Sequence, residues 1–219
     1  MIYQLHFSLK NTKPLVWRRV QMPAEDATFG DLAAVCIGAM GWDNSHLHEF
    51  FDLDDPDVKR IGMILEEEDE DYLEDEDELL LSERFNLEGQ VIGMDYDLGD
   101  SWEHHITLEA ILDEESIAAP QIMNGANACP PDDIGGIPGY YTMVEALKDR
   151  NHEQHESFLD WLDFDEGETW DVSEFDIDEA QETILMYWTD EEIDMDEFMN
   201  ELGIDDDSAD WDNEDEEVE

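Results

Sequence analysis

The amino-acid sequence predicts an α+β protein with antiparallel strands and a helical C-terminal part. In several segments of the first half of the chain, apolar residues alternate with polar ones, which is the period of a half-buried strand. In the second half, apolar residues recur mainly at helical spacing. The chain is 41% hydrophobic and 10% aromatic, so it can build a sizeable core.

The chain begins with a predicted pair of strands. Apolar residues alternate from Tyr3 to Leu9, Lys13-Pro14 marks a turn, and residues 15–22 form a second strand antiparallel to the first. Four of the nine basic residues lie here, and we interpret them as charge balance for acidic surroundings: Lys10, Lys13, Arg18 and Arg19.

A helix is predicted next. Thr28 and Asp31 have the spacing of a capping box, an apolar stripe runs from Leu32 to Met40, and Gly41 ends the helix. Cys36 lies on this stripe, so we expect it in the core rather than at a reactive site.

The following segments predict more strands, a loop and three helices. Residues 45–53 return to strand alternation, and residues 90–112 indicate two long strands joined by a turn at 98–100. Residues 120–139 are rich in Gly, Pro and Asn and are predicted as an ordered loop or a linker. Helices are predicted at 140–147, 155–162 and 180–188.

The C-terminal end has a pattern of its own. Thr189 and Glu192 have capping-box spacing, and the helix that follows carries one narrow apolar stripe: Met195, Phe198, Met199 and Leu202. We therefore divide the chain into an α+β domain at residues 1–189 and an acidic amphipathic helix with a disordered tail at 190–219. The stripe either docks on the domain or binds a basic groove on a partner protein.

The charge of the chain limits its partners. It has 64 acidic and 9 basic residues, a net charge of −55, with 11 acids at residues 66–78 and 10 at residues 204–219. Such a field repels nucleic-acid phosphates and anionic lipid, so direct nucleic-acid binding is not expected. Basic protein partners, cations or a salt-rich cytoplasm fit better, and the two dense runs are predicted as solvated loops or tails.

Export and membrane insertion are not expected. The N-terminus shows no cationic stretch followed by an apolar signal core, and no apolar run approaches the ~20 residues that span a bilayer. Two cysteines, Cys36 and Cys129, do not make a disulfide framework. We therefore expect a cytoplasmic protein without membrane partners.

Five stretches together resemble the plasmid pRiA4b ORF-3-like family. They occur in the family's order over roughly residues 2–182: YQLHFSLKNTKPLVWRRV, AMGWDNSHLHEF, YDLGDSWEHHITLE, NACPPDDIGGIPGYYTMVEAL, and HEQHESFLDWL with EFDIDEA. The resemblance implies a compact fold in which an antiparallel, curled sheet packs against helices. It also implies an association with plasmids and insertion elements, but no reaction and no catalytic residues. The acidic loop insertion at 66–78 and the tail after Leu202 depart from the family pattern.

Two histidines are the first candidates for chemistry. His46 and His48 lie two apart on a predicted strand, so they share a face with Cα atoms ~6.5–7 Å apart. This spacing lets two imidazoles meet one cation such as zinc. The alternative is a packing or surface role for both side chains.

The predicted hairpin carries the next candidates. Trp102 and His104 share its apolar face, and Asp100 lies in the turn. The structural alternatives are a buried, hydrogen-bonded histidine and an aspartate that bonds to nearby backbone N–H groups.

The segment Cys129-Pro130-Pro131-Asp132-Asp133, followed by two glycines, is the most unusual loop. Its prolines stiffen a chain that presents one thiol and two carboxylates. It can complete a metal site with His46 and His48 or with His104, or hold a nucleophilic cysteine beside a histidine. The alternative is a structural loop with Cys129 buried beneath it.

These observations leave three functional hypotheses. Established nucleotide-binding, zinc-protease and serine-hydrolase motifs are missing from the sequence, which favours a non-enzymatic binding or accessory protein that acts through protein contacts. The alternative is a metal-binding protein or metal-dependent enzyme with a divalent metal, in which the three candidate segments converge within ~10 Å. A second alternative is an anionic nucleic-acid mimic.

Overall fold

The computed structural model describes residues 1–113, 117–165 and 167–188. These residues belong to one compact unit, Met1–Trp188. The amphipathic helix predicted at 190–219, with its stripe of Met195, Phe198, Met199 and Leu202, lies outside the described residues.

The structure confirms the α+β fold class, with one open mixed sheet in the order β5-β4-β3-β6-β7-β1-β2-β8. Neighbouring strands are antiparallel except β4 and β5, which are parallel. The strands are β1 (Ile2–Leu9), β2 (Trp17–Pro23), β3 (His48–Asp52), β4 (Arg60–Gly62), β5 (Leu73–Asp75), β6 (Val91–Tyr96), β7 (Trp102–Leu112) and β8 (Gln121–Ala126).

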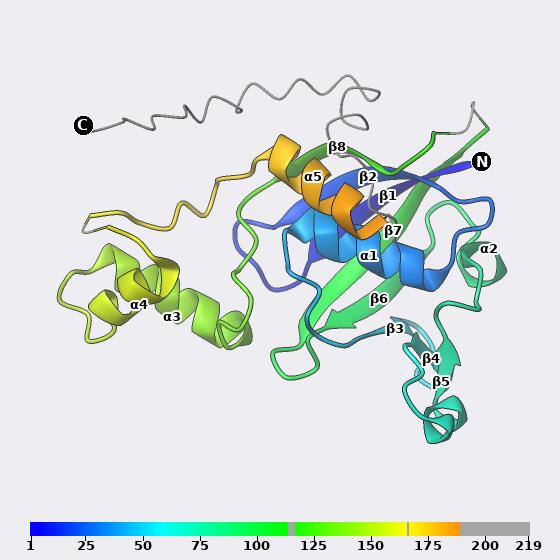
Figure 1. The fold of residues 1–219 in the computed structure, drawn as a ribbon, viewed down its shortest axis with the longest axis horizontal. Helices are drawn as coiled ribbons and strands as arrows, with labels where there is room; N and C mark the ends of the chain where they lie inside the picture. The colour runs from blue at the N-terminus through cyan, green and yellow to red at the C-terminus, as the bar shows by residue number, and fades with distance from the viewer. Residues whose placement is uncertain (114–116, 166, 189–219) are drawn as a thin grey trace, which may run out of the picture. The chain divides into compact units, whose positions relative to one another are not determined.

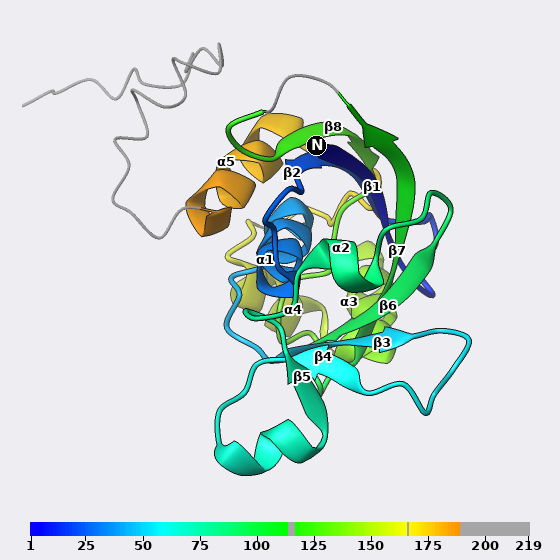
Figure 2. The same ribbon diagram turned by 90° about the vertical axis from the view of Figure 1, so that its right-hand side faces the viewer.

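The sheet curls around a central helix. Figure 2 shows the strands arching about α1, and Figure 1 shows α5 lying beside α1. The helices are α1 (Phe29–Met40), α2 (Leu81–Arg84), α3 (Gly136–Lys148), α4 (His155–Leu162) and α5 (Ile177–Trp188), with a 3-10 turn, η1 (Glu67–Asp71). None of the described helices is long and apolar enough to cross a bilayer.

Local sequence signals explain α1 and the central hairpin. Thr28 and Asp31 form the predicted capping box, and Gly41 ends α1 in the left-handed region at φ 87°. Along β7 the side chains from Trp102 to Leu108 alternate between buried and half-buried, as expected for a strand with one face in the core.

Three segments differ from the predictions. The loop expected at 120–139 contains the edge strand β8, where Ile122 is the only fully buried residue. The acidic run at 66–78 contributes η1 and β5, and its Glu76 is 3% exposed. The strand expected from residue 45 begins at His48, so His46 and His48 do not share a strand face. Tertiary pairing, which local periodicity does not report, decides all three.

Candidate functional site

A stack of aromatic side chains joins three separate segments at one end of the sheet. Trp42, just after α1, stacks on Tyr96 of β6 with ring centroids 4.9 Å apart, and its ring centroid is 5.8 Å from that of Trp102 in β7. The Trp42 indole N–H donates to the carbonyl of Pro130 at 2.8 Å. These contacts bring the residue that follows α1, the β6–β7 hairpin and the proline loop together.

Two backbone contacts fix the proline loop in place. The amide of Asp43 donates to Asp132 Oδ2 at 3.1 Å, and the amide of Gly135 donates to Asp100 Oδ2 at 2.9 Å. At Gly136, with φ 64°, a Cβ would lie 2.6 Å from the Asp100 carbonyl oxygen, so a larger residue would push the loop off the hairpin. Asp100 thus positions the loop instead of facing the candidate site.

The β6–β7 turn presents a second carboxylate, that of Asp97. Asp97 has φ 53°, a left-handed conformation that aspartate tolerates better than most residues. Its Oδ1 accepts from the amide of Gly99 at 2.9 Å, and its Oδ2 lies 4.0 Å from His46 Nδ1. The turn therefore holds one oxygen and directs the other toward the histidine.

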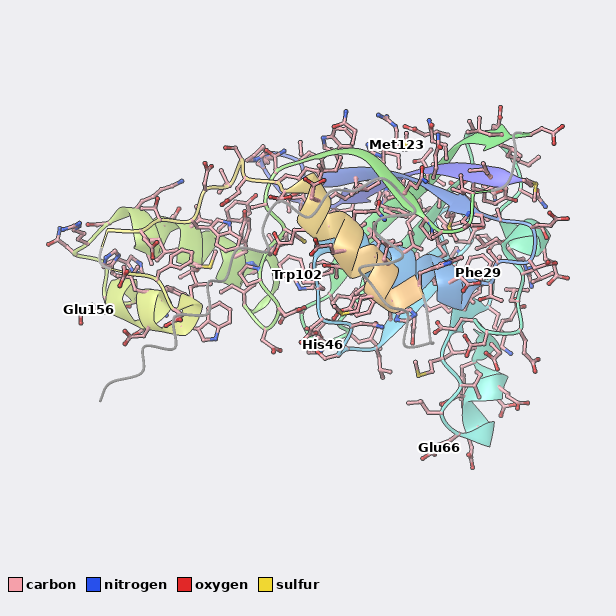
Figure 3. The ribbon with its side chains drawn as sticks, turned by 45° about the horizontal axis from the view of Figure 1, so that its top comes forward. Phe29, His46, Glu66, Trp102, Met123 and Glu156 are labelled. Carbon is pink, nitrogen blue, oxygen red and sulfur yellow. The ribbon has the colours of Figure 1, made fainter. Side chains whose placement is uncertain are left out.

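His46 lies between carboxylates from two segments. Its Nε2 is 3.5 Å from Asp133 Oδ1 in the proline loop, and its ring contacts Tyr96 edge-on at 5.7 Å. One ring nitrogen of His46 and one oxygen each of Asp97 and Asp133 all lie within 4.8 Å of one another. Figure 3 labels His46, from the segment between α1 and β3, and Trp102, which begins β7.

Three buried polar atoms at this point have no hydrogen-bond partner among the described residues: His46 Nε2, Tyr96 Oη and Asp132 Oδ1. Burial raises the pKa of Asp132 to about 6 and also raises the pKa of Tyr96. Unpaired buried polar atoms cost free energy, and a bound cation or water would satisfy these three.

The local charge is strongly negative. Asp43, Asp97, Asp132 and Asp133 surround one histidine, and within the described ranges no Lys or Arg forms an ion pair with them. A divalent cation would offset this repulsion and occupy the unpaired ligand atoms. Three side-chain ligands would leave coordination positions open for water or substrate.

His48 has a different environment from His46. Its Nε2 lies 2.8 Å from Glu76 Oε2, and the two side chains are 7% and 4% exposed. The distance is that of an ion pair, although the angles are not those of a hydrogen bond. The predicted metal pair of His46 and His48 is therefore corrected: His48 faces a core carboxylate, and His46 faces Asp97 and Asp133.

His104 and Cys129 lie outside the carboxylate cluster. His104 is fully buried with its ring edge-on to Trp42, and burial lowers its pKa to about 4, so it is a neutral core residue at pH 7. Cys129 is partly buried beside Arg18, and burial raises the pKa of its thiol. A thiol with a raised pKa is a poor nucleophile, which disfavours the cysteine chemistry considered above.

Sequence reasoning missed Asp97 and Tyr96. Both belong to the segment YDLGD that begins the hairpin turn, from which only Asp100 was selected. The signal that could have identified Asp97 is its place before Leu-Gly, because an aspartate at that point accepts backbone N–H groups and leaves its second oxygen free.

Comparisons with known proteins agree with the fold. Residues 1–179 match the family described as "Plasmid pRiA4b ORF-3-like protein". The chain is 33% identical over 162 residues to "Uncharacterized protein y4hQ" of Sinorhizobium fredii, covering 73% of this chain and 80% of that protein. It also matches the crystal structure of the protein of unknown function MM3350 from Methanosarcina mazei Go1, with TM-score 0.68 and 36% identity, over 81% of this chain and 96% of that one.

The chain therefore belongs to the plasmid pRiA4b ORF-3-like family, as the sequence motifs indicated. The relatives described here carry no assigned function in their names.

Proposed function

We propose that this pRiA4b ORF-3-like protein binds one divalent transition-metal cation through His46, Asp97 and Asp133. The observation that carries the proposal is His46 Nε2, a buried nitrogen without a hydrogen-bond partner in the described part of the chain. It lies 3.5 Å from Asp133 Oδ1, in a cluster where no Lys or Arg of the described residues forms an ion pair.

The ligand set narrows the class of metal. One imidazole and two carboxylates suit Mn²⁺, Fe²⁺ or Zn²⁺ better than Ca²⁺ or Mg²⁺, which prefer oxygen ligands alone. At a metal–ligand distance of ~2.1 Å, two ligand atoms stand at most ~4.2 Å apart. The three candidate atoms lie within 4.8 Å, and Asp133, whose side chain is 74% exposed, can rotate to close the difference.

Metal binding is tested on the full chain. We expect natively purified protein to contain stoichiometric Mn, Fe or Zn, and metal-free protein to bind MnCl₂ or ZnCl₂ one to one in calorimetry. The titration is run in ~0.15 M NaCl, where the Debye length is ~8 Å and diffuse counterion binding is screened.

Matched variants separate the site from the general acidity of the chain. His46→Ala and Asp133→Asn should each weaken binding at least tenfold. Asp163→Asn is the control, because Asp163 also has a left-handed backbone, at φ 55°, but lies at the end of α4. Equal loss in the control, or several weak equivalent sites in the unaltered chain, would contradict the proposal.

A second candidate function is contact with a basic protein partner through residues 190–219. Its support is the sequence stripe of Met195, Phe198, Met199 and Leu202 within an acidic segment. The full chain is compared with a Met195→Asp/Phe198→Asp variant in an affinity capture. Recovery of the same partner by both proteins would contradict this role.

A further inference from the structure

Arg18 is a buried cation without an acidic partner. It lies on β2, is 2% exposed, and forms no ion pair within the described residues, although the chain has 64 acids. Its neighbour Arg19 pairs with Glu109 at 2.6 Å, so the charge-balance interpretation fits Arg19 and fails for Arg18. A buried charge without a counter-ion is costly unless other groups stabilise it, so its surroundings are informative.

Backbone carbonyls hold one side of the guanidinium. Nε donates to Ala39 in the last turn of α1 at 2.9 Å, where the helix dipole is negative. Nη1 donates to the carbonyls of Trp17, Ala126 and Asn127 at 2.9–3.1 Å. Nη2 donates to no group in the part of the chain that the structure describes, so the Nη2 edge of the guanidinium group has no hydrogen-bond acceptor there.

Arg18 lines a pocket of about 300 Å³ between the end of α1, the start of α5 and the proline loop. The Phe175 ring lies 3.9 Å from the guanidinium carbon, and Met40 and Ala180 add apolar surface. Trp170 also lines the pocket, and its buried indole N–H is directed to the Tyr140 side chain. A guanidinium and an apolar wall therefore share one pocket.

The remaining lining residues of the pocket include acids. Glu174 and Glu179 are exposed, and their carboxylates form no ion pair within the described ranges. Asp176 is occupied, because its Oδ1 accepts from the amides of Asp178 and Glu179 and caps α5. The pocket thus combines a buried positive charge with two free carboxylates nearer the solvent.

We propose that this pocket binds a small zwitterion of the amino-acid class. The carboxylate of the ligand pairs with Arg18 Nη2, its ammonium group faces Glu174 and Glu179, and its apolar side chain packs on Phe175. Phosphate fits less well, because the two exposed carboxylates repel a dianion and the apolar wall would gain no partner. The site is separate from the proposed metal ligands and does not depend on them.

A purely structural Arg18 is the competing explanation. In that case the residue only joins β2, α1 and the loop after β8, for which the bonds from Nε and Nη1 suffice. The two explanations predict different ligand binding, since a structural Arg18 needs no solute in the pocket.

Binding of four probes to the full chain is measured in NMR through the chemical shift of the Trp170 indole N–H. This signal is assigned by its loss in the Trp170→Phe variant. L-phenylalanine should bind most tightly and 3-phenylpropionate at least threefold more weakly. L-phenylalaninamide and 2-phenylethylamine, which lack the carboxylate, should bind at least tenfold more weakly. Tightest binding by 2-phenylethylamine, or no shift with any probe at 10 mM, would overturn the proposal.

Variants locate the bound probe. Arg18→Lys should weaken L-phenylalanine binding at least tenfold, because lysine keeps the charge but loses the Nη2 edge. Should that variant fail to fold, Thr183→Trp decides, since Thr183 lines the pocket and its hydroxyl donates within α5, to the Glu179 carbonyl. Met186→Trp is the matched control on the same helix at a residue that is 64% exposed. Undiminished binding by Thr183→Trp would overturn the proposal.

Discussion

His46 and His48 are two residues apart, yet their surroundings have opposite character. His48 lies in the core against the single carboxylate of Glu76, with both side chains almost fully buried. The His46 side chain is 24% exposed and lies among carboxylates from a turn and a loop.

The comparison separates two roles of a histidine side chain: stability at His48 and, in our proposal, metal binding at His46. The His48–Glu76 contact is closed to solvent, because the two side chains are only 7% and 4% exposed. The His46 cluster is open, since Asp97 and Asp133 lie on connections outside the strands. The following predictions test this contrast.

Removal of Glu76 should have the largest effect. Glu76→Ala leaves His48 buried without its partner, so we expect the free energy of unfolding in urea to fall by ~3–5 kcal/mol. Glu78→Ala, an exposed acid in the same run, is the control and should change it by less than ~0.5 kcal/mol. Equal effects in the two variants would show that the buried contact has no special importance.

His104 provides the next test, because this buried histidine has no carboxylate partner among the described residues. Burial lowers its folded pKa from 6.5 to about 4, so the unfolded chain binds more protons between these values. Stability should therefore fall as the pH falls from 6.5 toward 4. His104→Phe removes this titration, and the loss of unfolding free energy between pH 7 and pH 4 should shrink by ~3 kcal/mol.

The comparison of His104→Phe with the unaltered chain also controls for other groups that titrate in this pH range. Asp132 has a pKa raised to about 6, so its own contribution to stability falls as the pH rises from 3.8 through 6. That contribution is present with and without His104 and cancels in the difference. An unchanged pH dependence in His104→Phe would contradict the expected effect of burial.

The metal should distinguish the two histidines directly. At ~100 times its dissociation constant, bound Mn²⁺ or Zn²⁺ should stabilise the folded chain by ~2.7 kcal/mol, visible as a higher melting temperature. His46→Ala should lose this shift. Glu76→Ala should keep the shift, although its melting temperature without metal is lower. Loss of the shift in both variants would contradict the assignment of metal binding to His46 and not to His48.

The smallest effect is expected at an exposed contact of the same type. His105 Nε2 lies 2.9 Å from Glu103 Oε1, with side chains 26% and 40% exposed. Glu103→Ala should change the free energy of unfolding by less than ~0.5 kcal/mol, because solvent screens the pair. A loss as large as that of Glu76→Ala would mean that burial does not explain the importance of the His48 contact.

Much of the fold follows from local patterns, whereas the candidate site does not. The strand pair at the N-terminus, the capped α1, the β6–β7 hairpin and the helices α3 to α5 were predicted from periodicity, caps and turn residues. Strand β8 was missed because a polar edge strand with one buried side chain, Ile122, has almost no alternation to detect.

The sequence by itself determined the fold class, the buried face of β7, the boundaries of α1 and the excess of negative charge. Each depends on neighbours within a few residues or on composition, which the linear order contains. Only the tertiary structure decided that Asp97 and Asp133 meet His46, that Glu76 meets His48, and that Arg18 is buried without an ion-pair partner among the described residues. These contacts join segments far apart in the chain, and their identity depends on strand pairing and loop docking, for which a single sequence contains no local periodic signal.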